Sequence, residues 1–318
     1  MGAEPRESTS RVEVRSLERG DLDAVVALDR RIIGRSRRGY FERRLASALR
    51  DPRAHLQMAA VGPSGLVGFM LTRITSGEYG RPAPAVLLEA VGVDPSMQRA
   101  GIGRRMLGAL HEIARARGVG TTVTEVDWRN HAMLEFLDGA GFTLAPRLLL
   151  ERKVARMPLP ETDEAIEQVP PHIRHLRADD FDAVVRIDAL ATGRDRTDYF
   201  RRKFDEALHE SGLAVSLVIE DDGFVVAFAM VRVDLGDFGH IEPSASLETL
   251  GVNPSFARKG YARDMLAQMI DNLAALHIES VETEVAHDHY ELLRFFHHFG
   301  FKPSQRLVFH ATGPGRSP

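Results

Sequence analysis

The feature that most constrains this chain is a long internal repeat. Residues 88–96 (LEAVGVDPS) return as residues 247–255 (LETLGVNPS), an offset of 159 positions. The same offset relates residues 21–26 (DLDAVV) to residues 180–185 (DFDAVV). Because solenoid repeats are only about 20–50 residues long, a period of this length predicts two whole domains.

The spacing of the repeat sets the expected domain boundaries. A length of 318 residues is sufficient for two domains that each bury a core. We place the first domain at residues 11–153 and the second at residues 173–311. The segment between them, residues 154–172, is rich in proline and acidic residues and has no apolar period, so we interpret it as a linker.

Composition narrows the classes of function. The chain has no cysteine, which excludes disulfides, thiol nucleophiles and cysteine metal ligands. Its net charge of −4 argues against broad nucleic-acid binding. No apolar run approaches the roughly 18–20 residues of a membrane span, and the N-terminus has no signal-peptide core. We therefore expect a cytoplasmic protein without nucleic-acid or membrane partners.

Hydrophobic periodicity predicts the same order of elements in both halves. In the first half we expect helices at 22–33, 41–49 and 132–138, a long helix that ends at Gly118, and strands at 12–15, 55–61, 66–74, 86–93 and 122–126. Residues 142–144 and 148–151 are expected to form a closing strand pair. A central sheet with helices predicts an α/β or α+β fold in each half.

Each half places a glycine-rich turn between a buried strand and a helix, at residues 98–103 and 257–262. Glycine lets backbone N–H groups crowd around an anion, and the helix N-terminus adds partial positive charge, so such a turn suits a phosphate. The Gly-Lys-Ser/Thr of a P-loop and the three-glycine spacing of a Rossmann fingerprint are absent. The alternative is a glycine that only closes a tight connection.

The motif around the first turn resembles the acetyl-CoA signature of the GNAT superfamily of N-acetyltransferases. Val93-Asp94-Pro95 precedes Gln98-x-x-Gly101-x-Gly103, and a strand ending at Glu125-Val126, then Asn130 and Gly141-Phe142, follow. The resemblance covers nearly the whole chain, once per half. It implies two tandem GNAT-like domains, each a mixed, mostly antiparallel sheet flanked by helices, with coenzyme A between splayed central strands.

The resemblance also implies acetyl-CoA as co-substrate, with pantetheine along the backbone of the central strand and the diphosphate at the turn. In the first half the implied coenzyme residues are Val91, Val93, Gln98, Arg99, Gly101, Ile102, Gly103, Arg104 and Asn130. In the second half they are Leu250, Val252, Arg258, Lys259, Gly260, Tyr261, Ala262 and Arg263. The second half departs from the pattern at Ala257, in the Gln98 position, and at His289, in the Asn130 position. We therefore expect the first half to bind acetyl-CoA more firmly.

Two glutamates in each half are candidates for the catalytic base. Transfer to an amine requires removal of a proton from an ammonium with a pKa of about 10. Glu89 and Glu248 lie in the middle of apolar strands, where burial raises the pKa of a carboxyl. Glu125 and Glu284 lie on the next strand, in the position where this chain resembles ribosomal-protein acetyltransferases and their base. The alternative is that these carboxylates pair with arginines and hold the sheet together.

One expected catalytic group is missing. The general acid of the superfamily is usually a tyrosine four residues before the Gly-Phe pair, but Leu137 and Phe296 occupy that place. Tyr40 and Tyr199 begin the second helix of each half, where they either reach the cleft or pack in the core.

The residues expected around the acceptor pocket include both basic and acidic side chains. In this superfamily the loop between the first two helices shapes the acceptor pocket, and here it is rich in arginine: Arg35, Arg37, Arg38, Arg43, Arg194, Arg196, Arg201 and Arg202. Such a lining favours an acceptor with carboxylate or phosphate groups, unless it is only a solvated face. The loop at residues 77–80, echoed at 236–239, offers an acid to an incoming ammonium. The histidines at 287, 289, 297 and 298 have no counterparts in the first half, and we predict no metal site.

Three functional hypotheses remain open. The first is an enzyme that transfers acetyl from acetyl-CoA to a primary amine, on a small molecule or a protein N-terminus, by direct attack. The second is a coenzyme A-binding sensor or scaffold in which one or both halves are catalytically silent. In the third, the first half catalyses and the second half completes the pocket or stabilises the pair. The acceptor and the oligomeric state cannot be read from these motifs.

Overall fold

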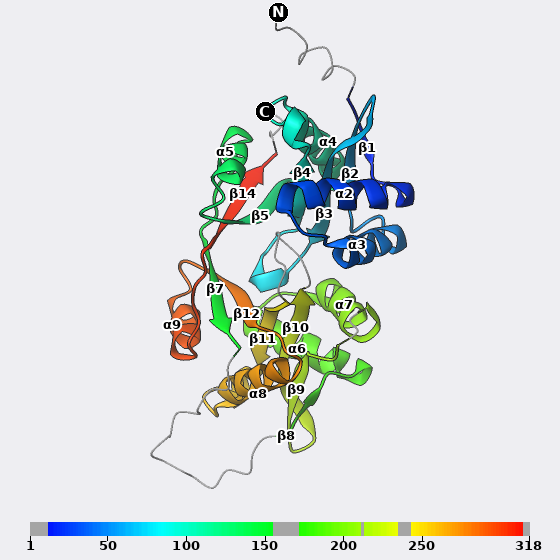
Figure 1. The fold of residues 1–318 in the computed structure, drawn as a ribbon. Coiled ribbons are helices and arrows are strands. Elements are labelled where there is room, and N and C mark those ends of the chain that lie inside the picture. The colour runs from blue at the N-terminus through cyan, green and yellow to red at the C-terminus, as the bar shows by residue number, and fades with distance from the viewer. Residues whose placement is uncertain (1–11, 155–171, 211–212, 235–242, 314–318) are drawn as a thin grey trace, which may run out of the picture.

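The computed structural model describes residues 12–154, 172–210, 213–234 and 243–313. Within these residues the chain forms two seven-stranded sheets, one above the other, with helices packed against each (Figure 1). Both sheets are mixed, since a single parallel pairing in each joins otherwise antiparallel strands. The expected fold class, two tandem domains of this kind, is confirmed.

The elements of the first repeat follow the expected order: β1 (Glu13–Ser16), α2 (Leu22–Ile33), α3 (Arg38–Arg50), β2 (Met58–Gly62), β3 (Gly65–Thr75), the 3-10 turn η2 (Glu78–Gly80), β4 (Ala85–Val93), α4 (Ile102–Ala116), β5 (Thr121–Asp127), α5 (His131–Gly139), β6 (Thr143–Leu144) and β7 (Arg147–Lys153). Those of the second repeat are β8 (His172–His175), α6 (Phe181–Thr192), α7 (Thr197–Asp205), β9 (Leu217–Asp221), β10 (Phe224–Asp234), β11 (Ser244–Val252), α8 (Tyr261–Ala275), β12 (Ser280–Ala286), α9 (Tyr290–His298), β13 (Lys302–Pro303) and β14 (Arg306–Thr312).

One expected strand begins later than its apolar pattern indicates. The strand expected at 55–61 starts at Met58, and His55 forms only an isolated bridge with Arg73. The side-chain amide of Gln57 donates to the carbonyl of Thr72 at 3.2 Å and accepts from its N–H at 3.2 Å. This side chain thus replaces the backbone ladder at the start of β2.

The last strands of the two repeats are exchanged. The first sheet has the order β1-β2-β3-β4-β5-β14-β6, and the second has the order β13-β7-β12-β11-β10-β9-β8. Strand β14 pairs with β5 from Arg306 opposite Asp127 to Thr312 opposite Thr121. Strand β7 pairs with β12 along its whole length in the second sheet (Figure 1). Each repeat therefore completes the sheet of the other.

The expected closing strand pair of residues 142–144 with 148–151 is wrong. Strand β6 pairs with β14, whereas β7 joins the second sheet. The two exchanged strands occupy equivalent places in the repeat. Either one therefore fits the same position in either sheet with the same side-chain alternation. Alternation alone cannot choose between them. The sheets therefore do not divide at residue 153, although the sequence ranges of the two repeats remain our prediction.

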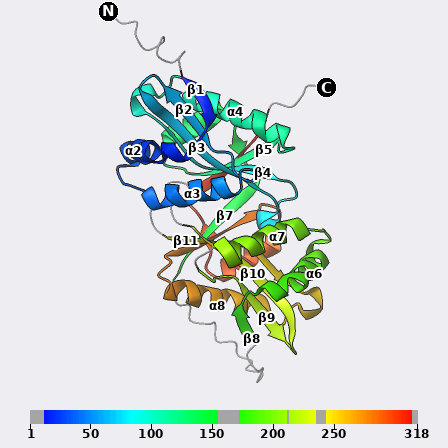
Figure 2. The same ribbon diagram turned by 90° about the vertical axis from the view of Figure 1, so that its right-hand side faces the viewer.

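Helices cover both faces of each sheet and divide each core into two parts. On one face of the first sheet α2 and α3 lie side by side (Figure 2) and pack Leu28 and Phe41 against Phe69. On the other face α4 contributes Met106 and Leu110. Equivalent clusters cover the second sheet, with α6 and α7 on one face and α8 and α9 on the other. The two sheets are thus separate packing units joined by their exchanged strands.

Two irregularities separate the central strands of each sheet. Strands β4 and β5 pair only at Val86–Thr122 and Leu87–Val123, and β4 then continues to Val93 paired with β3 but not with β5. The register between β3 and β4 also shifts by one residue, so that Glu89 is the extra residue of a β-bulge. Bulges re-aim side chains beside active sites. The second repeat has the same bulge at Glu248.

Candidate active site

A cavity of about 500 Å³ lies at the glycine-rich turn of the first repeat. Its lining includes all nine coenzyme residues expected from the sequence of that repeat: Val91, Val93, Gln98, Arg99, Gly101, Ile102, Gly103, Arg104 and Asn130. The cavity therefore has the elements needed for a phosphate and an extended chain: a helix N-terminus, basic side chains and a strand edge that β5 leaves unpaired.

The backbone of this turn is shaped to receive an anion. Arg99 and Gly101 have positive φ angles of 63° and 80°, and their counterparts Arg258 and Gly260 have 65° and 86°. Gly101 is the N-cap of α4 and has no side chain to accept from the amides of the first helical turn. The first four N–H groups of a helix lack partners within the helix, so they point toward any anion bound there.

Side chains on the rim of this cavity are exposed and basic. The side chain of Arg99 is 88% exposed and lies 3.7 Å from Glu135. Asn130 has a structural task, because its side chain accepts from the N–H of Met133 at 3.2 Å and caps α5. In the second repeat His289 caps α9 in the same way, accepting from the N–H of Leu292 at 3.4 Å.

A second cavity of about 340 Å³ adjoins the first and shares Ile32, Val91, Asn130 and Met133 with it. Its lining adds three charged side chains near the splay of β4 and β5, namely Glu89, Glu125 and Arg306. The two cavities together form one cleft, with an anion site at one end and carboxylates at the other.

Glu89 is held by two arginines. It is 1% exposed and sits on the β4 bulge. Arg73 donates to Glu89 Oε1 through Nε at 2.7 Å, and Arg44 Nη2 lies 3.1 Å from the same oxygen. This double pairing fits the structural alternative considered for this residue, while its place in the cavity wall keeps the carboxylate beside the cleft.

Glu125 has a different environment. Its nearest cation is Arg306 on the exchanged strand β14, with Nη1 at 2.9 Å from Oε2. Burial raises the pKa of Glu125 to about 7, because a poorly hydrated carboxylate is disfavoured; Arg306 opposes this shift, and Glu282 and Glu284 add to it. A carboxyl that titrates near neutrality can accept and release a proton at physiological pH.

The glutamates of the second repeat are also paired. Lys203 Nζ lies 2.7 Å from Glu248, and Arg232 donates to Glu248 at 3.1 Å. Glu284 accepts from Arg81 at 2.6 Å and from Arg147, which is on the exchanged strand β7. Arg147 is the repeat counterpart of Arg306, so each exchanged strand brings an arginine to the other repeat's glutamate.

A loop of the first repeat, residues 76–81, contacts charged side chains of the second repeat. The carbonyl of Gly77 accepts from Arg196 at 2.5 Å, and the carbonyl of Tyr79 accepts from Arg147 at 2.6 Å. Arg81 binds Glu284. Arg196, Arg147 and Glu284 are the repeat counterparts of Arg37, Arg306 and Glu125, which line the open cavity of the first repeat.

Buried contacts hold this loop in place. Glu78 is 4% exposed and lies 3.3 Å from Lys203 and 3.7 Å from Arg73. A side chain on Gly77 would meet the Tyr199 ring at 2.9 Å, so only glycine fits there. The expectation that this loop offers an acid to an incoming amine is thus wrong for Glu78, which is engaged by buried cations. The echo at 236–239 lies outside the described residues.

The arginine-rich segment contributes one residue to the lining of the 340 Å³ cavity. Of its four first-repeat arginines, Arg37 lines the cavity, and its Nη2 lies 2.6 Å from the buried carboxylate of Asp29. Arg196 makes the equivalent pair with Asp188 at 2.8 Å. Arg38 points to Asp23 and Glu42 at the surface. Charge-paired arginines attract an anionic acceptor less strongly than the expectation assumed.

The tyrosines that begin the second helix of each repeat are core residues. Tyr40 and Tyr199 are buried in the core, and the hydroxyl of Tyr199 lies 2.6 Å from Thr249 Oγ1. Leu137 and Phe296 are buried as well, so the place of the usual tyrosine is filled by core side chains. In the described part of the chain no group of three or more His, Asp or Glu is arranged to hold a metal.

The turn of the second repeat has its own polar contacts. The hydroxyl of Tyr261 donates to Asp221 at 2.5 Å, and Lys259 Nζ lies 3.5 Å from the same residue and 4.6 Å from the Phe256 ring. Arg263 bonds Asp264 at 2.9 Å. Ala262 stands where the first repeat has Gly103, whose Cα lies so close to Phe136 that a Cβ would be 2.8 Å from the ring.

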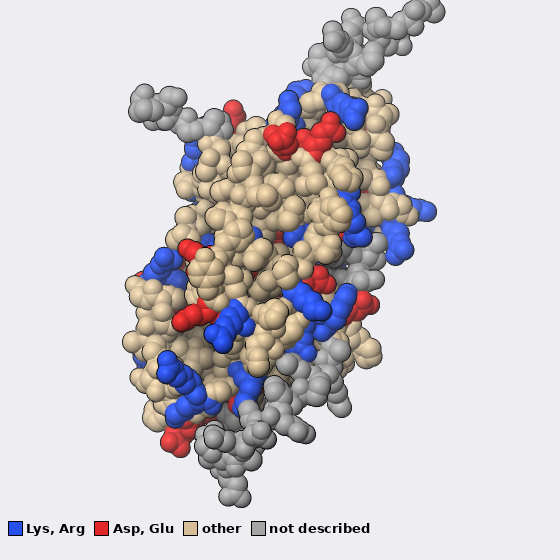
Figure 3. Space-filling view, turned by 90° about the vertical axis from the view of Figure 1, so that its left-hand side faces the viewer, with Lys and Arg blue, Asp and Glu red and all other residues tan. Residues whose placement is uncertain are grey.

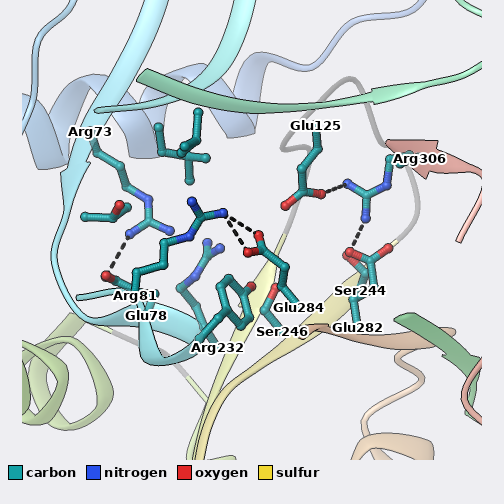
Figure 4. A pocket seen from close by; sticks show the side chains of 14 residues that line it. Arg73, Glu78, Arg81, Glu125, Arg232, Ser244, Ser246, Glu282, Glu284 and Arg306 are labelled. Carbon is teal, nitrogen blue, oxygen red and sulfur yellow. Dashed lines mark hydrogen bonds and ion pairs between the residues drawn. The ribbon is translucent and has the colours of Figure 1, made fainter. Parts of the chain in front are cut away.

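The interface between repeats is lined by charged side chains from both. A small cavity there is lined by Arg73, Glu78, Arg81, Glu125, Arg232, Glu282, Glu284 and Arg306, among others (Figure 4). On the outer face drawn in Figure 3, Lys and Arg are interspersed with Asp and Glu. None of the helices in the described ranges is long and apolar enough to cross a membrane.

Comparison with known proteins agrees with this geometry. Residues 23–142 and 173–301 match the acetyltransferase (GNAT) family. The chain belongs to this family. The mycothiol acetyltransferase of Propionibacterium freudenreichii subsp. shermanii is 26% identical over 204 residues, 59% of this chain and 64% of that protein. The chain thus matches less than two thirds of that relative's length.

Solved structures show the same tandem fold. A GCN5-related N-acetyltransferase from Sphaerobacter thermophilus superposes with a TM-score of 0.63 and 16% identity, over 97% of this chain and 98% of that one. A tandem GNAT protein from the clavulanic acid biosynthesis pathway superposes with a TM-score of 0.64 and 16% identity, over 96% and 99%. At this identity the likeness concerns the fold, including its two-repeat architecture.

Sequence reasoning missed the residues that complete the site from elsewhere. Arg306 and Arg73 pair with Glu125 and Glu89, and Arg44 adds a second cation to Glu89. A signal for Arg306 exists, since Arg147 and Arg306 stand at the same repeat position before an apolar strand. The repeat position alone does not indicate which sheet each strand joins.

Proposed function

We propose that the first repeat transfers an acetyl group from acetyl-CoA to a primary amine by direct attack, with Glu125 as general base. The observation that carries this proposal is the pair of adjoining cavities, which have a glycine-rich turn with positive φ angles at one end and Glu125 at the other. Burial raises the pKa of Glu125 to about 7, which supports its role. The acceptor is a small-molecule amine or a protein N-terminus.

Acetyl-CoA is proposed to bind along the splayed end of β4. The diphosphate would be held by the first-turn amides of α4, with Arg99 and Arg104 adding charge. The pantetheine would pair with the backbone of Val91 and Val93, where β4 continues beyond its pairing with β5. Gln98, Gly101, Ile102, Gly103 and Asn130 complete this proposed binding surface.

The proposed chemistry needs no covalent enzyme intermediate. The acceptor ammonium loses a proton to Glu125, directly or through water, and its nitrogen then attacks the thioester carbonyl carbon. The new C–N bond forms as the C–S bond breaks, the nitrogen loses its second proton to water, and coenzyme A leaves as a thiolate that takes up a proton from solvent. General-base catalysis of this kind contributes roughly 10²–10⁴ in rate.

Glu89 is proposed to hold the cleft wall in shape rather than to carry the proton. Two guanidinium groups pair with its Oε1 within a buried strand, at 2.7 Å and 3.1 Å. Its contribution to the reaction would be to orient the bulge that leads into β4.

The second repeat is proposed to bind coenzyme A without turnover. Its turn has the same backbone angles as the first, and Leu250, Val252, Arg258, Lys259, Gly260, Tyr261, Ala262 and Arg263 would form its coenzyme surface. Its acceptor side, however, holds loop Ser76–Arg81, so Glu284 and Glu248 would serve as ion-pair partners. This supports the third hypothesis, in which the second repeat stabilises the pair.

Thiol release from acetyl-CoA with a broad panel of primary amines tests the proposal. Turnover with at least one amine, lost in Glu125→Gln, supports it. Tight acetyl-CoA binding with no turnover on any amine would instead support the sensor hypothesis. Calorimetric titration adds the number of coenzyme sites, for which we expect two per chain, with the tighter one in the first repeat.

A further inference from the structure

We propose that the second repeat supplies two positioning residues, Arg306 and Glu282, to the catalytic site of the first repeat. The inference rests on the proposed role of Glu125 as base. It makes that site composite, because strand β14 and strand β12 both belong to the second repeat in sequence while facing a carboxylate of the first.

The geometry begins with one arginine between two carboxylates. Arg306 is 7% exposed and is the first residue of β14. Its Nη1 lies 2.9 Å from Glu125 Oε2, while its Nη2 contacts Glu282 (Figure 4). Glu282 is 6% exposed and lies on β12. A single guanidinium is therefore divided between the proposed base and a carboxylate from the other repeat.

The equivalent place in the second repeat has the opposite balance. Glu284 binds two guanidinium groups, those of Arg81 and Arg147. Two guanidinium groups share one carboxylate there, whereas in the first repeat two carboxylates share one guanidinium. The number of ion-pair partners thus distinguishes the surroundings of the two glutamates at the same repeat position.

Other charged groups around Glu125 are arranged so that Arg306 and Glu282 dominate. The charged residues that line the two cavities facing Glu125, beyond this pair, are Asp29, Arg37, Arg73, Glu78, Arg81, Glu89, Asp127, Arg232 and Glu284. Of these, Arg37 pairs with Asp29, Arg73 and Arg232 pair with Glu89 and Glu248, and Arg81 pairs with Glu284. Lys203 neutralises Glu78, and Arg129 neutralises Asp127.

The electrostatics agree with this arrangement. The pKa of Glu125 is raised to about 7 chiefly by burial; among nearby charges Arg306 is the largest influence and lowers it, and Glu282 follows and raises it. The two residues therefore act on the base in opposite directions. Their contribution can be separated by substituting each in turn.

Titration of the Glu125 carboxyl by carbon-13 NMR tests the inference in the full-length protein without any acceptor. The signal is assigned by its loss in Glu125→Gln. In Arg306→Gln we expect the midpoint to rise by about 1–3 pH units, as is typical when a carboxylate loses a close cation. In Glu282→Gln we expect it to fall by about one unit, because a like charge is removed and Arg306 is left to Glu125 alone.

Arg147→Gln is the matched control. It removes the equivalent arginine from the other exchanged strand, at the same repeat position and with a similar buried contact, but its partner is Glu284. The Glu125 midpoint should stay within titration error of the unsubstituted protein. If Arg306→Gln does not fold, Glu282→Gln still decides the matter, since glutamine is nearly isosteric with glutamate.

The outcomes separate this inference from the proposed function. Opposite shifts in Arg306→Gln and Glu282→Gln, with none in Arg147→Gln, support the composite site whether or not an acceptor has been found. An unmoved midpoint in both variants overturns it. Turnover that survives Glu125→Gln overturns the proposed base instead, because that result does not depend on the titration.

Discussion

The candidate sites of the two repeats have the same framework, but different groups surround their equivalent glutamates. In each repeat the glutamate at the β-bulge pairs with an arginine on the neighbouring strand. The next strand carries a second glutamate, which is contacted by an arginine of the exchanged strand. The first cleft is a cavity that reaches Glu125, whereas loop Ser76–Arg81 lies against the counterpart groups of the second. The duplicated fold thus keeps its pairing pattern while the described groups around the two equivalent glutamates, Glu125 and Glu284, differ.

The loop that contacts the second repeat differs in sequence from its repeat counterpart. Arg81, which binds Glu284, has His240 as its counterpart, and Glu78 has Asp237. An arginine can make two hydrogen bonds to a carboxylate in a fixed geometry, which a histidine cannot reproduce.

The largest expected effect concerns the strand exchange, which links the two clefts. The chain has no cysteine, so a new pair is the only one present. Thr121→Cys with Thr312→Cys should form a disulfide within the chain, because the two residues are directly opposite on β5 and β14. Opposite Cα atoms in an antiparallel pair are about 4.5–5.5 Å apart, within disulfide range.

The control for this pair uses the repeat counterpart of Thr312. Lys153 would face Thr121 if each repeat kept its own last strand, but it pairs with Ser280. Thr121→Cys with Lys153→Cys should stay reduced under the same mild oxidation, as measured by thiol-specific labelling and mass spectrometry. A bond in this control pair, and none in the first, would refute the exchange.

The second effect is the pH dependence of turnover. The base must be ionised, and the pKa of Glu125 is raised to about 7. Activity should therefore rise with pH through neutrality and fall roughly tenfold per unit well below it, since the ionised fraction falls in that proportion. Rates at saturating acetyl-CoA between pH 5 and pH 8 measure this, and a flat profile across that window would contradict the assignment.

The smallest effect tests the contact that closes the second cleft. Gly77→Val should lower the free energy of unfolding by about 2–5 kcal/mol, since φ is +104° and a Cβ would meet the Tyr199 ring at 2.9 Å. Gly80→Val in the same loop should lower it by only about 1–2 kcal/mol, because φ is +70° but nothing lies within 4 Å of the new Cβ. Denaturant unfolding compares them, and equal losses would mean that the loop does not pack on Tyr199.

Local features of the site could be predicted from the sequence, because a turn is specified by its own residues. Glycine at positions 101 and 260 allows the left-handed angles, and the apolar strand before the turn fixes where the helix begins. The residues expected to contact coenzyme in the first repeat accordingly line one cavity. Gln98 and Asn130 are recognisable for the same reason, since both belong to short contiguous motifs.

Features set by register or by contacts between repeats could not be predicted. The bulge at Glu89 depends on how β3 pairs with β4, and an alternation pattern does not report one inserted residue. The partnership of Glu125 with Arg306 depends on the exchange of two strands that have equivalent patterns. The expected arginine-rich acceptor lining failed in part because Arg37 and Arg196 pair with aspartates eight residues earlier, on the preceding helix.

The central claim, that only the first repeat catalyses, is tested most directly by comparing Glu125→Gln with Glu284→Gln in thiol release from acetyl-CoA. Both changes replace a glutamate by glutamine at the same repeat position, but Glu284 pairs with two arginines and Glu125 with one, so the folding of each variant is verified separately. The account predicts a loss of roughly 10²–10⁴ in turnover for Glu125→Gln and a rate near that of the unsubstituted protein for folded Glu284→Gln. Equal losses in the two variants, or a loss confined to Glu284→Gln, would contradict it.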